Sequence, residues 1–509
     1  MSRRRNPASL FCLIVIGGLI SAARAEPPAA KTAADAELTR LETLADAQQA
    51  RIEQLEATLT AAAAHPQEAD RTAQMKAQIR EVLSDSAFRE SLLPPTTQAG
   101  YQWGFYIRSS DDKFTMLANV LLQFRWTHYA TRSENRYLAP GFRRSDHTGF
   151  DLARARFRLY GNVYSKDLTY FLLLDMSAPG GYDAQLRYAW VNYRFADEFQ
   201  TGAGVFRMAS TRADASWAGG MPMTEYPMSN ALFGLWRGVG VRFWGSLLKG
   251  RGEYYLDIVN SLSEAYPRTI VNDEDLYALG HDNNPAVVFR TLWDVLGEQV
   301  AHKDDDAHFS DPCDLAFHEE PALNIGGHYA FNEDRHDGLT PVPYARRTFF
   351  RKGGFGVTNS DGLQLHQIGL DAGFKYRGFS ATAEYVVRVL DVREAARAPF
   401  SPLFLATGDS STSVQHGGYL QCGYFLPIPG LERKLEMVGR LEGITINTGG
   451  HEGTWIYSGG LNYYIDGHRV KLQTDVTKIS EVPLASPSYS LANVNDDALI
   501  WRVQLQLVF

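Results

Sequence analysis

The last nine residues, Trp501-Arg502-Val503-Gln504-Leu505-Gln506-Leu507-Val508-Phe509, alternate between apolar and polar side chains over most of their length. The polar members, Arg502, Gln504 and Gln506, fall on one face of an extended chain, and only Val508 breaks the alternation. A repeat of two residues is typical of a β-strand whose two faces have different surroundings. The C-terminus therefore predicts a strand with one apolar and one polar side.

The same repeat recurs from about residue 100 onward, and it is clearest in 367–376 and 379–389. Similar segments lie at 114–130, 150–164, 168–176, 184–195, 199–209, 235–248, 251–262, 286–296, 322–331, 415–426, 433–447, 453–466 and 468–479. With the C-terminal strand, the sequence predicts 16 strands.

Two architectures produce this alternation. A soluble sandwich has one face on its core and one in water. A transmembrane barrel has one face in lipid and one in a polar lumen. An export signal, aromatic residues near the strand ends, and connections that alternate between short and long favour an all-β, 16-stranded antiparallel transmembrane β-barrel. The sandwich is the alternative.

The N-terminus predicts a secretory signal peptide over residues 1–25. Three arginines, Arg3 to Arg5, precede an apolar run over 9–20, and Ala23-Arg24-Ala25 forms a cleavage site. Cleavage would remove four of the 50 basic residues and leave 46 against 58 acidic ones, a net charge of −12. That balance argues against a nucleic-acid partner. No other segment approaches 18 consecutive apolar residues, which excludes a helical membrane protein.

Residues 26–99 predict a periplasmic linker and a coiled-coil helix. Heptad positions are occupied by Leu38, Leu41, Ala45, Gln48, Ile52, Leu55 and Leu59. A solitary amphipathic spacer helix is the alternative. A second helical stretch, 71–93, ends at Pro94-Pro95, which cannot continue a helix. The barrel domain is predicted over 100–509.

Several short motifs resemble, in order, the strands of the phosphate-selective porin family (porin O/P type) of Gram-negative outer membranes. They are Gly104-Phe105-Tyr106-Ile107-Arg108-Ser109 as the opening strand, 149–156, 202–207, 237–241, Leu435-Glu436-Met437 with Arg440, 459–464 and 468–473. The resemblance implies a 16-stranded homotrimeric porin that passes anions guided by an arginine ladder and a lysine cluster. The chain departs from the family at Leu435 and Tyr463, where tryptophan is usual, and at Met208-Ala209, where Pro-Phe is usual.

The pleat predicts a positively charged lumen. Arg154, Arg156 and Arg158 alternate with apolar residues, and charge on a lipid face costs about 2–4 kcal/mol per arginine at the bilayer midplane. The basic residues expected to face inward are Arg125, Arg154, Arg156, Arg158, Arg242, Lys375, Arg388, Arg440, Arg469, Lys471 and Arg502. Inward acids are Asp371, Glu384, Glu436, Glu442 and Asp475. Rings of basic side chains select anions, but the same arginines could instead pair with these acids and stiffen the wall.

Residues 210–234 are expected to fold into the pore as a constriction loop, with Trp217, Glu225 and Tyr226 as its candidate residues. Glycine and proline in this stretch allow the chain to bend inward. An exposed surface loop is the alternative.

The stretch 302–320 contains the residue types of a metal site but no standard ligand spacing, which favours an acidic, solvated loop. Cys313 and Cys422 could pair in an oxidising compartment. No catalytic motif is present, although His128, His366 or His416 near strand ends could serve a barrel enzyme.

The sequence therefore predicts a porin in the outer membrane of a Gram-negative-type bacterium. It would be surrounded by outer-membrane lipid, pass small anions such as phosphate, and need no cofactor or metal. A barrel enzyme and a closed structural or adhesion barrel are the alternatives.

Overall fold

The computed structural model describes residues 97–131, 146–177, 182, 184–260, 285–297, 311–334, 363–392, 412–445, 453–481 and 497–509. The signal peptide predicted over 1–25 and the helices predicted within 38–93 lie outside these residues. In the part of the chain that is described, no helix has the length and apolar character needed to cross a membrane.

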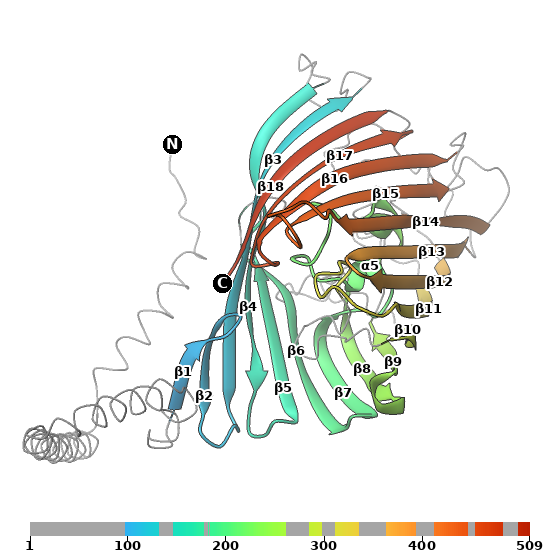
Figure 1. The fold of residues 1–509 in the computed structure, drawn as a ribbon. Helices are drawn as coiled ribbons and strands as arrows, with labels where there is room; N and C mark the ends of the chain where they lie inside the picture. Colours follow the sequence, from blue (N-terminus) through green and yellow to red (C-terminus); the bar gives the residue numbers. More distant parts are fainter. Residues whose placement is uncertain are drawn as a thin grey trace, which may run out of the picture. The chain divides into compact units, whose positions relative to one another are not determined.

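Sixteen antiparallel strands pair with their neighbours in chain order, and the last of them, β18, pairs with the first, β3. Figure 1 shows the red β18 lying beside β3, so the ring is closed. The strands are β3 (Thr115–Thr131), β4 (Asp146–Asn162), β5 (Leu168–Asp175), β6 (Gln185–Ala196), β7 (Phe199–Arg207), β8 (Arg237–Leu247), β9 (Gly252–Val259), β10 (Ala286–Leu296), β11 (Ala322–Asp334), β12 (Leu363–Tyr376), β13 (Phe379–Val392), β14 (Thr412–Phe425), β15 (Leu435–Thr445), β16 (Thr454–Asp466), β17 (Val470–Ser480) and β18 (Ala498–Val508). The predicted 16-stranded barrel is confirmed, and each predicted strand overlaps one of these.

The opening strand that the family resemblance implied, residues 104–109, is not one of these sixteen. The segment expected to open the barrel lies in β2 (Phe105–Ser109), which forms a hairpin with β1 (Thr97–Tyr101) outside the ring. The physical reason is the length of β3, which has 17 residues against 11 in its ring partner β18. Residues Thr115 to Ala118 of β3 therefore have an edge that β18 does not reach, and β2 pairs with it.

The barrel buries its polar side chains and exposes its apolar ones. On β18, Arg502 and Gln504 are buried at 2% and 0% exposure, whereas Trp501 and Leu505 are 46% and 40% exposed. A soluble sandwich would bury the apolar face instead, so the sandwich alternative is wrong. The inverted pattern is the one expected of a barrel whose outer face meets lipid.

The two ends of the ring meet at one end of the barrel, because Val120 and Phe509 exchange backbone hydrogen bonds of 2.7 and 3.1 Å. In an antiparallel barrel with an even number of strands, the start of the first strand and the end of the last strand lie at the same end. The short connections, such as 377–378 and 467–469, lie at the same end. The connection 297–321 is an exception, because it is long and yet joins strands at the short-turn end.

Candidate pore and its lining

The connection between β7 and β8, residues 208–236, is buried inside the barrel and is called the inward segment here. It contains two short helices, α5 (Arg212–Ala215) and α6 (Met228–Phe233), and the side chain of Thr211 caps the first. The exposed-loop alternative is therefore wrong for the 210–234 stretch. Its action as a constriction stays a prediction.

Side chains on the inner wall donate hydrogen bonds to carbonyl oxygens of the inward segment. Four of these donors come from the neighbouring strands β3, β16, β17 and β18, and others come from β10, β12 and β15. The four pairs on the neighbouring strands are Gln123 with Ala218 at 3.2 Å, Gln506 with Gly219 at 2.9 Å, Lys471 with Met221 at 2.9 Å and Asn462 with Pro222 at 2.7 Å. A buried loop needs such partners, because its backbone polar groups have no water to bind.

Carboxylates on the wall accept hydrogen bonds from backbone N–H groups of the same segment. The pairs are Asp257 with Ala209 at 2.7 Å, Glu384 with Ala213 at 3.2 Å, Asp475 with Thr224 at 2.9 Å and Glu442 with Ser229 at 3.0 Å. Three of these four acids were predicted to face inward. Their contacts show that they anchor the inward segment to widely separated strands.

Glu225 of the inward segment lies between two wall arginines. Arg125 contacts its Oε1 at 2.5 Å, and Arg154 contacts its Oε2 at 2.9 Å. Burial acts to raise the pKa of Glu225, but the two guanidinium groups outweigh it and hold the pKa well below the ordinary value. Glu225 is thus an ionised carboxylate that neutralises part of the arginine row.

Asp371 on β12 carries a second buried ion pair. Arg212 of α5 contacts its Oδ1 at 2.7 Å, and Arg290 of β10 contacts its Oδ2 at 2.7 Å. All three side chains are at most 6% exposed. Removing one member of a buried pair costs much more than an exposed pair is worth, so Asp371 ties α5 firmly to the wall.

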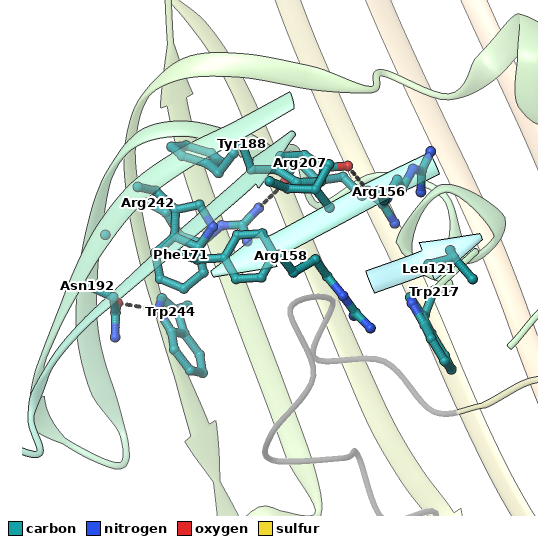
Figure 2. Close-up of a pocket in the computed structure, with 14 residues that line it drawn as sticks. Leu121, Arg156, Arg158, Phe171, Tyr188, Asn192, Arg207, Trp217, Arg242 and Trp244 are labelled. Carbon is teal, nitrogen blue, oxygen red and sulfur yellow. Dashed lines mark hydrogen bonds between the residues drawn. The ribbon is translucent and has the colours of Figure 1, made fainter. Parts of the chain in front are cut away.

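A partly open pocket remains between the inward segment and the inner face of β3 to β8 (Figure 2). About 730 Å³ of it is free of atoms when the open solvent at its mouth is counted, and about 40 Å³ of that is open to the centre of a water molecule. The described residues that line it include four arginines and no carboxylate. The lining consists of Leu121, Arg156, Arg158, Phe171, Leu173, Tyr188, Trp190, Asn192, Gly202, Phe206, Arg207, Trp217, Arg242 and Trp244.

Each pocket arginine is held in place. Arg156 pairs with Asp175 at 3.1 Å, and Arg242 pairs with Asp257 at 2.6 Å. Arg207 donates to the hydroxyl of Tyr188 at 2.8 Å and to backbone carbonyls of the inward segment. Arg158 donates to Asn119 at 2.7 Å, and its guanidinium carbon lies 5.1 Å from the ring centre of Trp217. The pocket therefore holds its positive charges in fixed positions.

The structure places the remaining predicted basic residues as follows. Arg440 pairs with Glu442 at 2.9 Å, Arg502 pairs with Asp475 at 3.4 Å, Lys375 is buried, and Arg388 donates to Gln367 at 2.9 Å. Arg469 lies in the turn before β17, where it pairs with Asp466 at 2.8 Å. Among the arginines expected to line the lumen, six thus pair with carboxylates. Two of them, Arg440 and Arg502, pair with acids that the wall-stiffening alternative named.

Sequence reasoning missed Arg207, Arg290, Asp175 and Asp257 as inward charges. The two-residue repeat of β10 predicts an inward-facing Arg290, because its neighbours Phe289 and Thr291 lie on the opposite face. Strand pairing would also have placed Asp257 beside Arg242, since these residues are register partners on β9 and β8.

The described part of the connection 297–321 is packed inside the short-turn end rather than solvated. Cys313 is 1% exposed, and its thiol donates to the carbonyl of Gly220 at 3.5 Å. Asp314 accepts the N–H of Gly378 at 2.7 Å, and Phe317 packs on Phe425. The expectation of an acidic, solvated loop is therefore wrong for residues 311–315, whereas Glu319 and Glu320 are exposed.

Donor atoms of Asp311, Cys313 and His468 lie within 4.8 Å of one another, a spacing open to a metal ion. However, His468 contacts Asp311 through Nε2 and Lys471, at 3.4 Å, through Nδ1. Burial lowers the pKa of His468, while His468 holds that of Asp311 below its usual value despite burial. The imidazole of His468 lies between a carboxylate and an ammonium group, so we assign the group an anchoring role.

Cys313 and Cys422 are both free, so the open possibility of a disulfide is not realised. His128, His366 and His416 do not converge. Each contacts a hydroxyl group of a neighbouring strand, on Thr148, Tyr329 and Tyr385 respectively. All three share the outer, apolar face of their strands, where they are suited to an interface between lipid and water.

No protein-family model matches the chain, and no curated protein matches it. Among solved structures, it is similar to the anion-selective porin from Comamonas acidovorans, with a TM-score of 0.50 and 8% identity over 77% of this chain and 99% of that one. It also matches the outer membrane channel DcaP of Acinetobacter baumannii (TM-score 0.47, 10% identity, 81% and 100% covered) and OprB of Pseudomonas putida (0.44, 8%, 77% and 94%). At these identities the likeness extends to the fold alone.

Proposed function

We propose that the chain is an outer-membrane porin through which small anions diffuse passively, with phosphate as one candidate solute. The observation that carries the proposal is the pocket beside the inward segment, whose described lining holds four guanidinium groups. Two of them pair with carboxylates of the wall, Asp175 and Asp257, which do not line the pocket. A low-dielectric wall concentrates the field of guanidinium groups and raises the local concentration of anions. Guanidinium groups also match the paired oxygens of phosphate and carboxylate.

The export signal and the apolar outer face support an outer-membrane location. The ordered motifs that resemble the phosphate-selective porin family support the same function and a homotrimer. The predicted N-terminal coiled coil would help to hold that trimer on the periplasmic side. Outer-membrane lipid is then the main partner of the barrel.

One observation favours a second candidate, a closed structural barrel. The inward segment is anchored to the wall on β9, β13, β15 and β17. Its apolar residues, among them Met228 and Phe233, form a cluster with strand residues inside the ring. A barrel filled in this way would conduct no ions if the pocket does not run through it.

Single-channel recording of the full chain in a planar bilayer under a KCl gradient separates the two. The porin proposal expects a stable open channel with an anion-signed reversal potential, which the double variant Arg156→Ala/Arg158→Ala shifts toward zero. Arg469→Ala is the matched control, because it removes a guanidinium group from an exposed turn. Unchanged selectivity in the double variant, or no conductance from folded protein, would overturn the proposal. Titrated phosphate that reduces the current at low concentration would add a phosphate site.

A further inference from the structure

The middle of the inner face of β5 and β6 is apolar, although barrel lumens are generally polar. Asp175 and Asn192 flank it on the same face. Phe171 and Leu173 on β5 and Tyr188 on β6 are buried at 3–7% exposure, and they form a cluster with Tyr160 and Trp190. In contrast, the inner faces of β17 and β18 carry lysine, arginine, glutamine and aspartate. The lumen thus has one apolar wall and one polar wall.

The inward segment does not account for the apolar wall. The cluster of Phe171, Leu173 and Tyr188 contains only residues from strands. Of the inward segment, only Trp217 is among the described residues that line the pocket. Several apolar residues of the segment, such as Met228 and Phe233, belong to a separate cluster with strand residues such as Leu365. That cluster meets the apolar wall at Trp190 and includes Phe206. The rings of the wall therefore border the pocket itself.

Charges stand directly beside these rings. Figure 2 shows Phe171, Tyr188 and Trp244 on the same side of the pocket as Arg207 and Arg242. The guanidinium carbon of Arg207 lies 5.4 Å from the ring centre of Tyr188, and that of Arg242 lies 4.8 Å from the ring centre of Phe206. A solute in the pocket would meet ring surfaces and N–H donors together.

We propose that this pocket is a binding site for organic anions that carry a carboxylate on an aromatic body, and that it selects them over inorganic phosphate. The proposal rests on the proposed porin function and specifies its substrate class. Inorganic phosphate exposes no apolar surface, so the rings of Phe171 and Trp244 contribute nothing to its binding. An aromatic carboxylate uses both walls, because its ring stacks on the aromatic side chains while its oxygens meet the guanidinium groups.

The test compares benzoate with acetate, inorganic phosphate and benzyl alcohol on the full chain. Reduction of single-channel current and calorimetric titration of the protein in detergent are measured in parallel, so that binding is tested whether or not the channel conducts. We expect benzoate to act at concentrations at least tenfold lower than acetate or phosphate. Benzyl alcohol, which has the ring without the charge, should bind at least tenfold more weakly than benzoate.

Phe171→Ala should remove the higher affinity for benzoate and leave the affinity for acetate unchanged. If the alanine variant does not fold, Phe171→Leu should retain part of the higher affinity for benzoate. Leu172→Ala is the matched control, because Leu172 points to the opposite side of the same strand. Equal action of benzoate and acetate, or full benzoate binding to both Phe171 variants, would overturn the inference. An anion-signed reversal potential without a preference for benzoate would overturn only the inference about aromatic carboxylates. A cation-signed reversal potential would overturn the proposed anion-porin function.

Discussion

Arg154 donates from its Nη2 to Oε2 of Glu225 at 2.9 Å, and this contact joins β4 to the middle of the inward segment. Arg125 reaches the other oxygen of the same carboxylate. The anion-attracting row predicted from the sequence is therefore partly neutralised by a loop residue. The positive electrostatic field that Arg125 and Arg154 present to the lumen therefore depends on Glu225 as well as on the two arginines.

Replacing that glutamate should increase anion preference. Glu225→Gln keeps the shape of the side chain but removes the charge that balances Arg125 and Arg154, so the reversal potential in a KCl gradient should move further toward the anion value. Asp466→Asn is the matched control, because it removes one charge in an exposed turn. A reversal potential equal to that of the wild type would show that these arginines do not face the ion path.

The same variant should have a pH-dependent effect on stability. The pKa of Glu225 lies below its ordinary value of 4.5, so its ion pairs stabilise the folded state fully above pH 4.5 and lose that contribution as pH falls toward the folded-state pKa. We expect Glu225→Gln to lower the unfolding temperature at pH 7 and the difference from wild type to narrow below pH 4.5. A constant difference between pH 7 and pH 3 would contradict this.

The strands could be predicted from the sequence because each lies between two different environments. The alternation along β12 and β13 is imposed by the pleat, which leaves no freedom in which side chains share a face. Ion pairs between neighbouring strands, such as Arg242 with Asp257, follow from the strand register and could have been predicted. The position of the β1–β2 hairpin outside the ring could not be predicted, because its residues alternate in the same way as those of a ring strand.

The contacts of the inward segment could not be predicted in the same way. The position of Glu225 depends on the whole path of 208–236, which has no periodic pattern. Half of residues 311–320 are charged or histidine, as in a solvated loop, and only Cys313, Leu315 and Phe317 are large apolar residues or cysteine that indicate burial. Sequence reasoning fails where wall side chains, rather than regular hydrogen bonding, fix the backbone.

Removal of Asp371 should destabilise the barrel strongly. Asp371→Ala leaves Arg212 and Arg290 buried without their shared carboxylate, which costs about 3–5 kcal/mol when one member of a buried pair is lost. Asp167→Ala is the comparison, because Asp167 pairs with Arg194 at an exposed site where such pairs contribute about 0–1 kcal/mol. Urea unfolding of vesicle-folded protein measures both, and similar losses would refute the buried role of Asp371.

The contact between Asp311 and His468 should hold residues 311–320 in the barrel mouth. Cys313 reports on this, because it is buried and burial raises the pKa of its thiol, which suppresses the reactive thiolate. In a Cys422→Ser background, we expect Asp311→Ala to increase the maleimide labelling rate of Cys313 at least tenfold. Glu432→Gln, an exposed carboxylate in the turn after β14, should leave the rate unchanged. Slow labelling in the Asp311 variant would mean that other contacts hold the segment.

Charge on the outer face of β14 should be costly in the middle of the strand and tolerated at its end. Leu420 and Tyr424 share that face at 50% and 40% exposure, and Leu420 lies near the centre of Thr412–Phe425. If lipid surrounds the barrel, Leu420→Arg should lower the free energy of unfolding in vesicles by about 2–4 kcal/mol, and Tyr424→Arg by about 0–1 kcal/mol. The comparison holds residue type and strand constant and changes only the depth. Equal effects of the two substitutions on urea unfolding would place this face outside a bilayer, because water imposes no dependence on depth.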